Sequence, residues 1–282
     1  MVEEYQKAVK LFREGMPYIK EFQGSTFLIK YGGAALDMPI TRRDVTGDIV
    51  LLSYVGINPV IVHGGGKEID RIEEKMGVSS GKKDGIRVTE CMDSVVAGLA
   101  KCNEELVGII NQVGGKAIGI SGSDGGLITP RPYGKDYGKT GSVGEINPEV
   151  IFHILNIGYI PVISTYATCP DGTCYNVNAD EVAGHLAIAV NARKLIMLTD
   201  TPGILEKKDD EESLMETIKS SSIETLKSKG IISGGMVPKI EACCKALKGG
   251  VKKAHILDGR KPGSLLVELL TKKGVGTEIV LD

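Results

Sequence analysis

The segment FLIKYGG, residues 27–33, places Lys30 directly before two glycines, at the end of an apolar run. In a phosphate-binding loop of the GxxxxGK[ST] type, the lysine follows the glycines, so Lys30 belongs to a different arrangement. A lysine at the end of a buried strand must meet an anion or reach water. The segment favours an anion site served by Lys30, and the alternative is a surface lysine whose stem lies along the protein.

A second lysine follows a second glycine pair. In the segment GGMVPK, Gly234 and Gly235 open an expected helix, and Lys239 lies about one turn inside it. Helix N-termini attract anions, and glycine lets an anion approach the backbone N–H groups closely. Lys239 is therefore a second candidate cation, with an ordinary exposed helix lysine as the alternative.

Glycine clusters also follow three apolar runs: Gly32 and Gly33, then Gly64, Gly65 and Gly66, then Gly122, Gly125 and Gly126. A single cluster most often reflects turn geometry. Several clusters at one edge of a parallel sheet predict a site for two anionic ligands. HGGGKEID lacks the GxGxxG fingerprint, which disfavours a dinucleotide-dependent dehydrogenase.

Two further segments carry polar side chains suited to binding. YNVNAD alternates Asn176, Asn178 and Asp180 before an expected helix that begins near Ala179. We expect Asn178 or Asp180 to cap that helix, which leaves Asn176 without a structural role. Arg87 in DGIRVT has a planar fork that matches a carboxylate, although an arginine on its own is usually a surface residue.

The elements that position these residues follow from the apolar runs. Most of the runs are separated by amphipathic stretches of helical length, and they span residues 26–33, 58–66, 116–126, 159–165, 194–203 and 252–259. Continuous β-branched runs indicate strands buried on both faces, and helical crossovers indicate parallel pairing. The sequence predicts an α/β fold, a three-layer αβα sandwich around a mostly parallel sheet with two lobes.

Other segments set the expected boundaries. Residues 5–22 predict an amphipathic helix that Gly15 and Pro17 should break or bend. Irregular structure or small hairpins are expected over 131–150, a helix from about Ala179 to Asn191, and a solvated charged loop over 206–217. The chain should divide into a helical extension, an N-terminal lobe and a C-terminal lobe, at residues 1–22, 23–168 and 169–282.

Composition narrows the functional class. The 282 residues are 42% hydrophobic and 25% charged, and the net charge of −2 gives no electrostatic footprint for nucleic acid. Charges interrupt the longest apolar stretch, 94–110, so no membrane span is expected. The beginning of the chain does not resemble a targeting segment, which predicts a cytoplasmic protein, or a plastid stromal one if a transit peptide has been removed.

The cysteines and histidines do not predict a metal site. Six cysteines include no CxxC pair, and four histidines share no ligand spacing. Cys169 and Cys174 flank PDGT and could face each other across a hairpin, but a redox role for them is the less favoured reading. A reducing compartment is the default expectation.

Eight motifs, in order from about residue 18 to the C-terminus, resemble those of the amino acid kinase family. They are IKYGGAA, VIVHGGG, DGIRVT, GYIPVI, YNVNAD, LIMLTDTPGIL, GGMVPKIEACC and KGVGTEIV. The resemblance implies an αβα sandwich whose N-terminal lobe binds an acyl substrate and whose C-terminal lobe binds ATP. It is strongest to members that phosphorylate the side-chain carboxylate of N-acetylglutamate in arginine biosynthesis, with Mg²⁺ held mainly by the nucleotide phosphates.

The resemblance also assigns roles to individual residues. Lys30 and Lys239 would contact the transferring phosphoryl group, and Asp180 would hold both lysines. The implied N-acetylglutamate ligands are Gly64, Gly65, Gly66, Arg87 and Asn176. The implied nucleotide contacts are Gly32, Gly33, Thr199, Asp200, Gly234 and Gly235, and no metal ligand is expected from the protein.

Partners are implied in the same way. The N-terminal helix resembles an extension that joins dimers into a hexamer in arginine-inhibited members, which predicts a homodimer or hexamer with arginine as an effector. Pro262 and Gly263 depart from the family's usual pattern near the arginine site. The segments DGR and ITPRP resemble plant-type members that bind the PII signalling protein. Another kinase of the same fold, acting on aspartate, glutamate, carbamate or UMP, and a non-catalytic arginine- or nucleotide-binding regulatory subunit are the alternatives.

Overall fold

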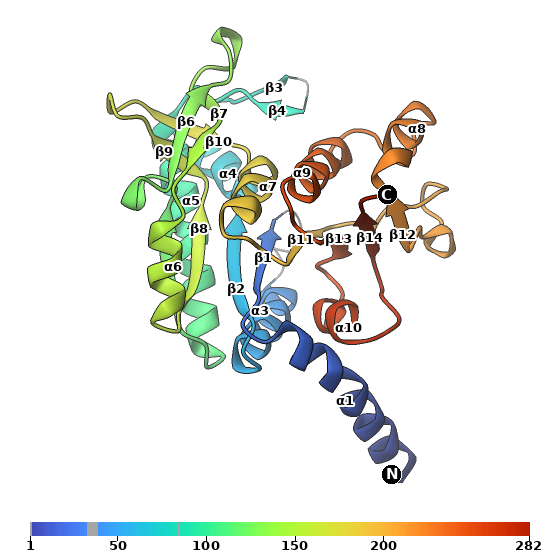
Figure 1. Cartoon of the computed structure of the whole chain (residues 1–282). Helices are drawn as coiled ribbons and strands as arrows, with labels where there is room; N and C mark the ends of the chain where they lie inside the picture. The colour runs from blue at the N-terminus through green and yellow to red at the C-terminus, as the bar shows by residue number, and fades with distance from the viewer. Residues whose placement is uncertain (1, 33–38, 84) are drawn as a thin grey trace.

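The computed structural model describes residues 2–32, 39–83 and 85–282, and its centre is one eight-stranded sheet (Figure 1). The strands, in spatial order, are β12 (Thr217–Lys219), β14 (Thr277–Val280), β13 (Lys253–Asp258), β11 (Lys194–Thr199), β1 (Thr26–Tyr31), β2 (Asn58–His63), β8 (Ile160–Ser164) and β5 (Ala117–Ser121). The pairs from β13 to β5 are parallel, and β14 runs antiparallel to β13. The predicted mostly parallel sheet is confirmed.

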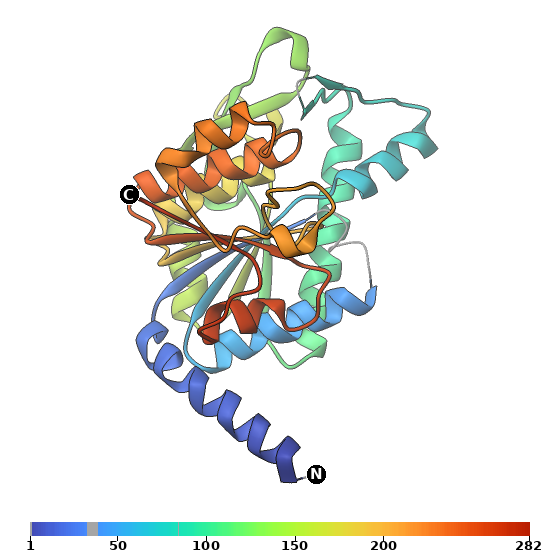
Figure 2. The ribbon, with the colours of Figure 1, turned by 90° about the vertical axis from the view of Figure 1, so that its right-hand side faces the viewer.

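Helices cover both faces of this sheet, as Figure 2 shows. One layer holds α6 (Glu149–Asn156), α7 (Ala179–Ala189) and α9 (Met236–Lys248), and the other holds α3 (Pro39–Tyr54), α5 (Met92–Gln112) and α10 (Ser264–Leu270). Alternate strand residues face the two layers, so Leu28 packs in one core while Phe27 and Ile29 pack in the other. The predicted three-layer sandwich is confirmed.

Smaller elements lie at the carboxyl ends of the strands. They comprise a four-stranded sheet of β6 (Ile128–Pro132), β7 (Thr140–Ile146), β10 (Cys174–Val177) and β9 (Tyr166–Thr168), and a hairpin of β3 (Lys82–Lys83) and β4 (Ile86–Arg87). The antiparallel pair β6–β7 confirms the hairpin expected over 131–150. Apart from the N-terminal helix, the other helices of the described residues are α4 (Gly66–Met76), α8 (Ile223–Ser228) and the 3₁₀ turns η1 (Asp124–Gly126), η2 (Lys135–Tyr137), η3 (Glu211–Ser213) and η4 (Ser220–Ser222).

Cys169, in the turn between β9 and β10, and Cys174, the first residue of β10, are both free thiols. The Cys169 thiol donates a hydrogen bond to the carbonyl oxygen of Pro130 at 3.2 Å. The charged segment 206–217 is mostly exposed, as expected.

The N-terminal helix α1 (Val2–Phe22) is continuous through Gly15 and Pro17, so the break, one of the two expected outcomes, does not occur. Pro17 is exposed, so the carbonyl that loses its helical hydrogen bond can reach water. Beyond the proline, Phe22 packs in the core and anchors the last turn. Gly15 lies against Leu270 of α10, and the part of α1 that precedes it projects from the body of the protein (Figure 1).

The sheet crosses the predicted boundary between lobes, because β1 pairs with β11 along its length. The division after residue 168 falls in the turn between β9 and β10 and remains a prediction. None of the described helices is long and apolar enough to cross a membrane.

Candidate active site

Three charged side chains from distant segments meet at the carboxyl edge of the sheet. Lys30 Nζ lies 2.8 Å from Asp180 Oδ1, and Lys239 Nζ lies 2.9 Å from Asp180 Oδ2. Asp180 is held in the first turn of α7, where the Asn178 side chain caps the helix by accepting from the N–H groups of Asp180 and Glu181. One carboxylate therefore holds two ammonium groups, as the resemblance implied, and Asn178 is the predicted cap.

The electrostatics of this cluster leave a surplus positive charge. Asp180 is 6% exposed, and burial alone would raise its pKa, but Lys30 and Lys239 outweigh burial and hold the pKa below its usual value. The carboxylate stays ionised, and two cations share it. Such a cluster attracts an anion that the carboxylate alone would repel.

Gly32 lies close to the ammonium group of Lys30. A Cβ atom on Gly32 would lie 2.8 Å from Lys30 Nζ, so a side chain there would shift this flexible group relative to Asp180. Glycine at this position therefore leaves the ammonium group unobstructed. Gly33 lies outside the described residues.

A buried, neutral histidine, His63, is hydrogen-bonded to the glycine turn after β2. His63 is fully buried, and burial lowers its pKa to about 4. Its Nδ1–H group donates to Gly64 O at 3.1 Å, and Nε2 accepts from Asn103 Nδ2 at 3.0 Å. A Cβ on Gly64 would lie 3.6 Å from Ala179, so the turn borders the helix that carries Asp180. Gly65 packs against Leu99, where a Cβ would come within 3.1 Å.

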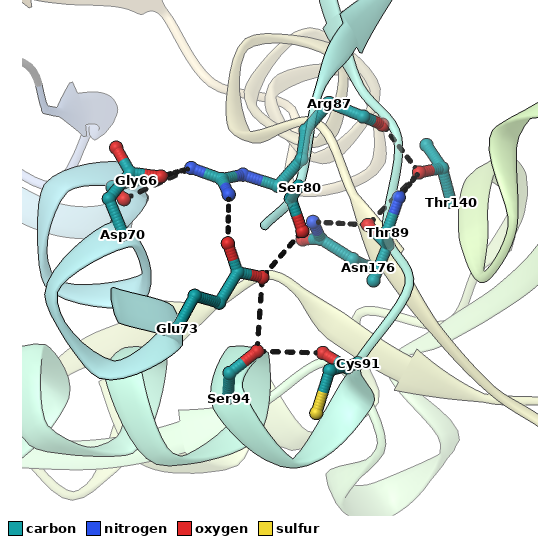
Figure 3. Close-up of polar contacts among 10 residues, drawn as sticks. All are labelled: Gly66, Asp70, Glu73, Ser80, Arg87, Thr89, Cys91, Ser94, Thr140 and Asn176. Atoms are coloured by element: carbon teal, nitrogen blue, oxygen red, sulfur yellow. Dashed lines mark hydrogen bonds and ion pairs between the residues drawn. The ribbon is translucent and has the colours of Figure 1, made fainter. Parts of the chain in front are cut away.

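Arg87 extends from β4 toward the beginning of α4, where three acceptors receive its guanidinium (Figure 3). Nη1 donates to Glu73 Oε2 at 3.1 Å, and Nη2 donates to Gly66 O at 3.1 Å and to Asp70 Oδ1. The Arg87 side chain is 12% exposed. It is not the ordinary surface arginine of the alternative reading.

A chain of hydroxyl groups links Arg87 to Asn176 (Figure 3). Asn176 Nδ2 donates to Thr89 Oγ1 at 3.0 Å, and the Thr89 and Thr140 hydroxyls lie 3.0 Å apart. Thr140 then donates to the backbone oxygen of Arg87 at 2.6 Å. The two predicted acyl-substrate ligands therefore lie at the ends of one hydrogen-bonded network, whose central threonines are buried.

The predicted nucleotide contacts lie on the other side of Lys30. Thr199 ends β11 and stands one residue beyond the Tyr31–Leu198 pair, level with Gly32. Its hydroxyl donates to Asp200 Oδ1 at 3.2 Å.

Gly234 and Gly235 precede α9 and line a cavity of about 710 Å³, which Asn178 also borders. An opening of this size beside the N-terminus of α9 leaves space for a ligand there.

Gly122 does not belong with the other glycine turns. It follows the edge strand β5, and a Cβ there would lie 2.8 Å from Tyr166 O, so close packing explains this glycine.

Sequence reasoning missed Asp70, Glu73, Ser80, Ser94 and Thr140. A signal existed for Glu73, because it falls one helical turn after Ile69 and shares that residue's buried face. A carboxylate on the apolar face of an amphipathic helix requires a partner, and Arg87 is that partner.

Comparisons with known proteins agree with this geometry. The amino acid kinase family model matches residues 25–258. An acetylglutamate kinase of Carboxydothermus hydrogenoformans is 44% identical over 98% of this chain and 99% of its own length. An acetylglutamate kinase of Archaeoglobus fulgidus is 46% identical, over 96% of this chain and 98% of that protein.

Solved structures share the architecture. N-acetylglutamate synthase from Neisseria gonorrhoeae, complexed with coenzyme A and N-acetyl-glutamate, superposes with a TM-score of 0.87 at 27% identity, over 97% of this chain and 63% of that longer one. Giardia carbamate kinase, at 17% identity over 92% of this chain and 99% of its own, gives a TM-score of 0.69 and shows the fold alone. With its αβα sandwich and its family match over residues 25–258, this chain belongs to the amino acid kinase family.

Proposed function

We propose that the chain transfers the γ-phosphoryl group of ATP to the side-chain carboxylate of N-acetyl-L-glutamate, giving N-acetyl-L-glutamyl 5-phosphate and ADP, the second step of arginine biosynthesis. The observation that carries the proposal is the pair of lysines on one buried carboxylate, in a chain whose near full-length relatives are acetylglutamate kinases. The cluster supports phosphoryl transfer, and the relatives support the choice of acceptor.

The reaction needs charge neutralisation more than proton transfer. The acceptor carboxylate is ionised at neutral pH, so its oxygen can attack the γ-phosphorus without a general base. The bond to the bridging oxygen breaks, and ADP leaves. We assign to Lys30 and Lys239 the stabilisation of the charge that develops on the phosphoryl oxygens. Asp180 keeps the two ammonium groups from separating by mutual repulsion.

The donor set fits a nucleotide with its metal on the phosphates. Both oxygens of Asp180 already contact lysines, which supports Mg²⁺ held mainly by ATP. When bound with the nucleotide, Mg²⁺ would neutralise part of the charge on the phosphates. Gly32, Gly234 and Gly235 offer backbone unencumbered by side chains, and Thr199 and Asp200 are the proposed contacts to the rest of the nucleotide.

The acyl substrate belongs on the Arg87 side. N-acetylglutamate carries two carboxylates, and the reacting one must face the lysines. We assign the other carboxylate to Arg87, and assign to Asn176 and the turn Gly64 to Gly66 the positioning of the rest of the molecule. An acyl-binding lobe over 23–168 and an ATP-binding lobe over 169–282 remain part of the proposal, with Asn176 reaching the acyl substrate from the second lobe and Gly32 reaching the nucleotide from the first.

The helix α1 is the proposed contact between copies of the chain. Val9, Phe12 and Met16 on this helix are exposed, with Phe12 at 71%. Apolar side chains on a projecting helix favour an interface, which supports a hexamer built from dimers. Arginine as an effector and PII as a partner remain finer proposals. Oligomer mass before and after deletion of residues 1–20, with activity measured against added arginine, tests the helix and the effector together.

Hydroxylamine trapping of the acyl phosphate tests the proposed reaction. With MgATP and N-acetylglutamate, we expect a hydroxamate and an equal amount of ADP. Glutamate and aspartate in the same assay, and ADP release with carbamate and UMP, test the other kinases of this fold. Faster turnover of any of these would contradict the proposed acceptor. Nucleotide or arginine binding without turnover of any acceptor would support the regulatory-subunit alternative.

A further inference from the structure

The guanidinium of Arg87 is already engaged by the protein at the position where we assign a substrate carboxylate. Glu73 and Asp70 each contact one terminal nitrogen, and Gly66 O accepts a second hydrogen bond from Nη2 (Figure 3). The two carboxylates come from the same helix, one turn apart along α4. An incoming anion therefore meets a cluster in which two carboxylates outnumber the single cation.

The geometry of a guanidinium determines which of these hydrogen bonds a bound carboxylate must replace. A carboxylate binds arginine through two parallel N–H groups, either Nη1 with Nη2 or Nε with Nη2. Both forks use a hydrogen of Nη2. Its two hydrogens go to Asp70 Oδ1 and Gly66 O. A bidentate contact with a ligand therefore requires Nη2 to release one of these two acceptors.

Of these two acceptors, Asp70 is the one that can leave. Gly66 O belongs to the backbone of the first turn of α4, so moving it would distort the helix. The Asp70 side chain is 59% exposed and can turn into water. Among the described residues, Arg87 is the only hydrogen-bond donor to the Asp70 carboxylate.

Glu73, unlike Asp70, is buried and is held by hydrogen bonds to both of its carboxylate oxygens. Its side chain is 4% exposed, and its second oxygen lies 2.6 Å from the Ser80 hydroxyl and 3.1 Å from the Ser94 hydroxyl. Ser80, Ser94 and Arg87, from three different segments of the chain, thus hold this carboxylate in place. Glu73 orients the guanidinium and has no route to solvent comparable to that of Asp70.

We propose that Asp70 is an internal competitor for the substrate carboxylate at Arg87: it occupies the guanidinium in the empty site and is displaced when the substrate binds, while Glu73 stays. The inference rests on the proposed function, in which N-acetylglutamate presents its second carboxylate to Arg87. Asp70 then sets the affinity for the acyl substrate and favours ligands that carry a carboxylate able to replace its own.

Replacing Asp70 with asparagine tests this competition. Asp70→Asn keeps the size of the side chain and removes its charge. We expect N-acetylglutamate to bind about five-fold more tightly, since an exposed ion pair is worth up to about a factor of five in affinity. The measurement is isothermal titration of N-acetylglutamate into the full-length protein without ATP, followed by the KM for N-acetylglutamate.

A control variant and a ligand analogue distinguish competition at Arg87 from a general effect of removing negative charge from the protein. Glu74→Gln removes one negative charge from the exposed face of the same helix, and we expect no change in affinity. The analogue 4-acetamidobutanoate lacks the second carboxylate, so its affinity should be equal in Asp70→Asn and the unsubstituted protein.

The outcomes are distinguishable. Unchanged or weaker binding of N-acetylglutamate to Asp70→Asn, an equal gain in Glu74→Gln, or an equal gain for 4-acetamidobutanoate would overturn the inference. If the unsubstituted protein forms the hydroxamate from N-acetylglutamate while Asp70→Asn shows no gain, only the competition fails. If the unsubstituted protein neither binds nor phosphorylates N-acetylglutamate, the proposed function itself fails.

Discussion

The two charged clusters of the candidate site have opposite ratios of cations to carboxylates. At the end of β1, one carboxylate, Asp180, is shared by two lysines. At the end of β4, one cation, Arg87, is shared by two carboxylates. The first cluster therefore has a surplus positive charge, and the second has a surplus negative charge.

This difference determines how each cluster can interact with an anion. The lysine cluster attracts a phosphoryl group with charge that is already in place, which suits stabilisation of a transition state. The arginine cluster must exchange an internal carboxylate for a ligand, which suits selective binding. Substitutions in the two clusters should therefore change different properties of the enzyme.

Removing Lys30 should have the largest effect. In Lys30→Ala we expect kcat to fall by about a hundredfold or more, because one electrostatic contact to the transferring group is typically worth about 3 kcal/mol. The KM for N-acetylglutamate should change far less. Steady-state kinetics check this, with the exposed Lys229→Ala as a control that should behave as the unsubstituted protein. Near-normal turnover in Lys30→Ala would rule out the assigned role.

Removing the shared carboxylate should reduce stability in a pH-dependent way. Asp180→Asn leaves two largely buried lysines facing each other, at a cost of about 3 kcal/mol in the free energy of unfolding. The pKa of Asp180 is lowered on folding, so its contribution is present above the ordinary value of 3.8 and is lost as pH falls through the lower folded pKa.

Denaturant unfolding of both proteins between pH 8 and 3 measures this contribution. The difference between Asp180→Asn and the unsubstituted protein should be constant at pH 5 and above, and should shrink below about pH 4. A difference that grows on acidification would contradict the assigned ionisation.

Removing Glu73 should destabilise the arginine cluster. Glu73→Ala takes away a buried partner of Arg87 and of two serine hydroxyls, and we expect a loss of about 2 kcal/mol in the free energy of unfolding. Glu74→Ala, on the exposed face of the same helix, is the matched control for chemical denaturation. Equal stability of the two variants would show that Glu73 does not support Arg87.

Shortening the arginine fork should act mainly on binding. In Arg87→Lys the bidentate contact is lost, and we expect the KM for N-acetylglutamate to rise about tenfold with a smaller change in kcat. The KM for ATP is the internal control, because the nucleotide contacts lie on the other side of Lys30. An unchanged KM for N-acetylglutamate would remove Arg87 from the binding site.

The smallest effect should come from the hydroxyl network. Thr89→Val keeps the shape of the side chain but removes the acceptor for Asn176, and we expect the KM for N-acetylglutamate to rise about threefold. Thr225→Val, on the exposed surface of α8, is the control. A rise of the same size in both variants would mean that the network does not position Asn176.

Local sequence signals predicted the scaffold of the site well. β-branched runs ending in glycine located β1, β2, β11 and β13, because strand burial and turn geometry depend on neighbouring residues. The cap at Asn178 followed from the same kind of local rule. The continuity of α1 through Pro17 did not, since solvent exposure of the proline and anchoring by Phe22 depend on tertiary packing.

The pairings within the site needed more than local signals. Lys30 and Lys239 lie in segments far apart in the sequence, and only the family resemblance joined them through Asp180. Glu73 was missed because a glutamate on a helix usually faces water. Its burial follows from the approach of β4 and α5, which bring Arg87 and Ser94 to the apolar face of α4.

We expect the lysine cluster to perform the chemistry and the arginine cluster to select the acceptor. Side-by-side kinetics of Lys30→Ala and Arg87→Lys with N-acetylglutamate and MgATP test this division of roles most directly. The loss should be confined mainly to kcat in the first variant and to the KM for N-acetylglutamate in the second. If both variants lose the same parameter, or if the two losses are exchanged, the two clusters do not divide the roles in this way.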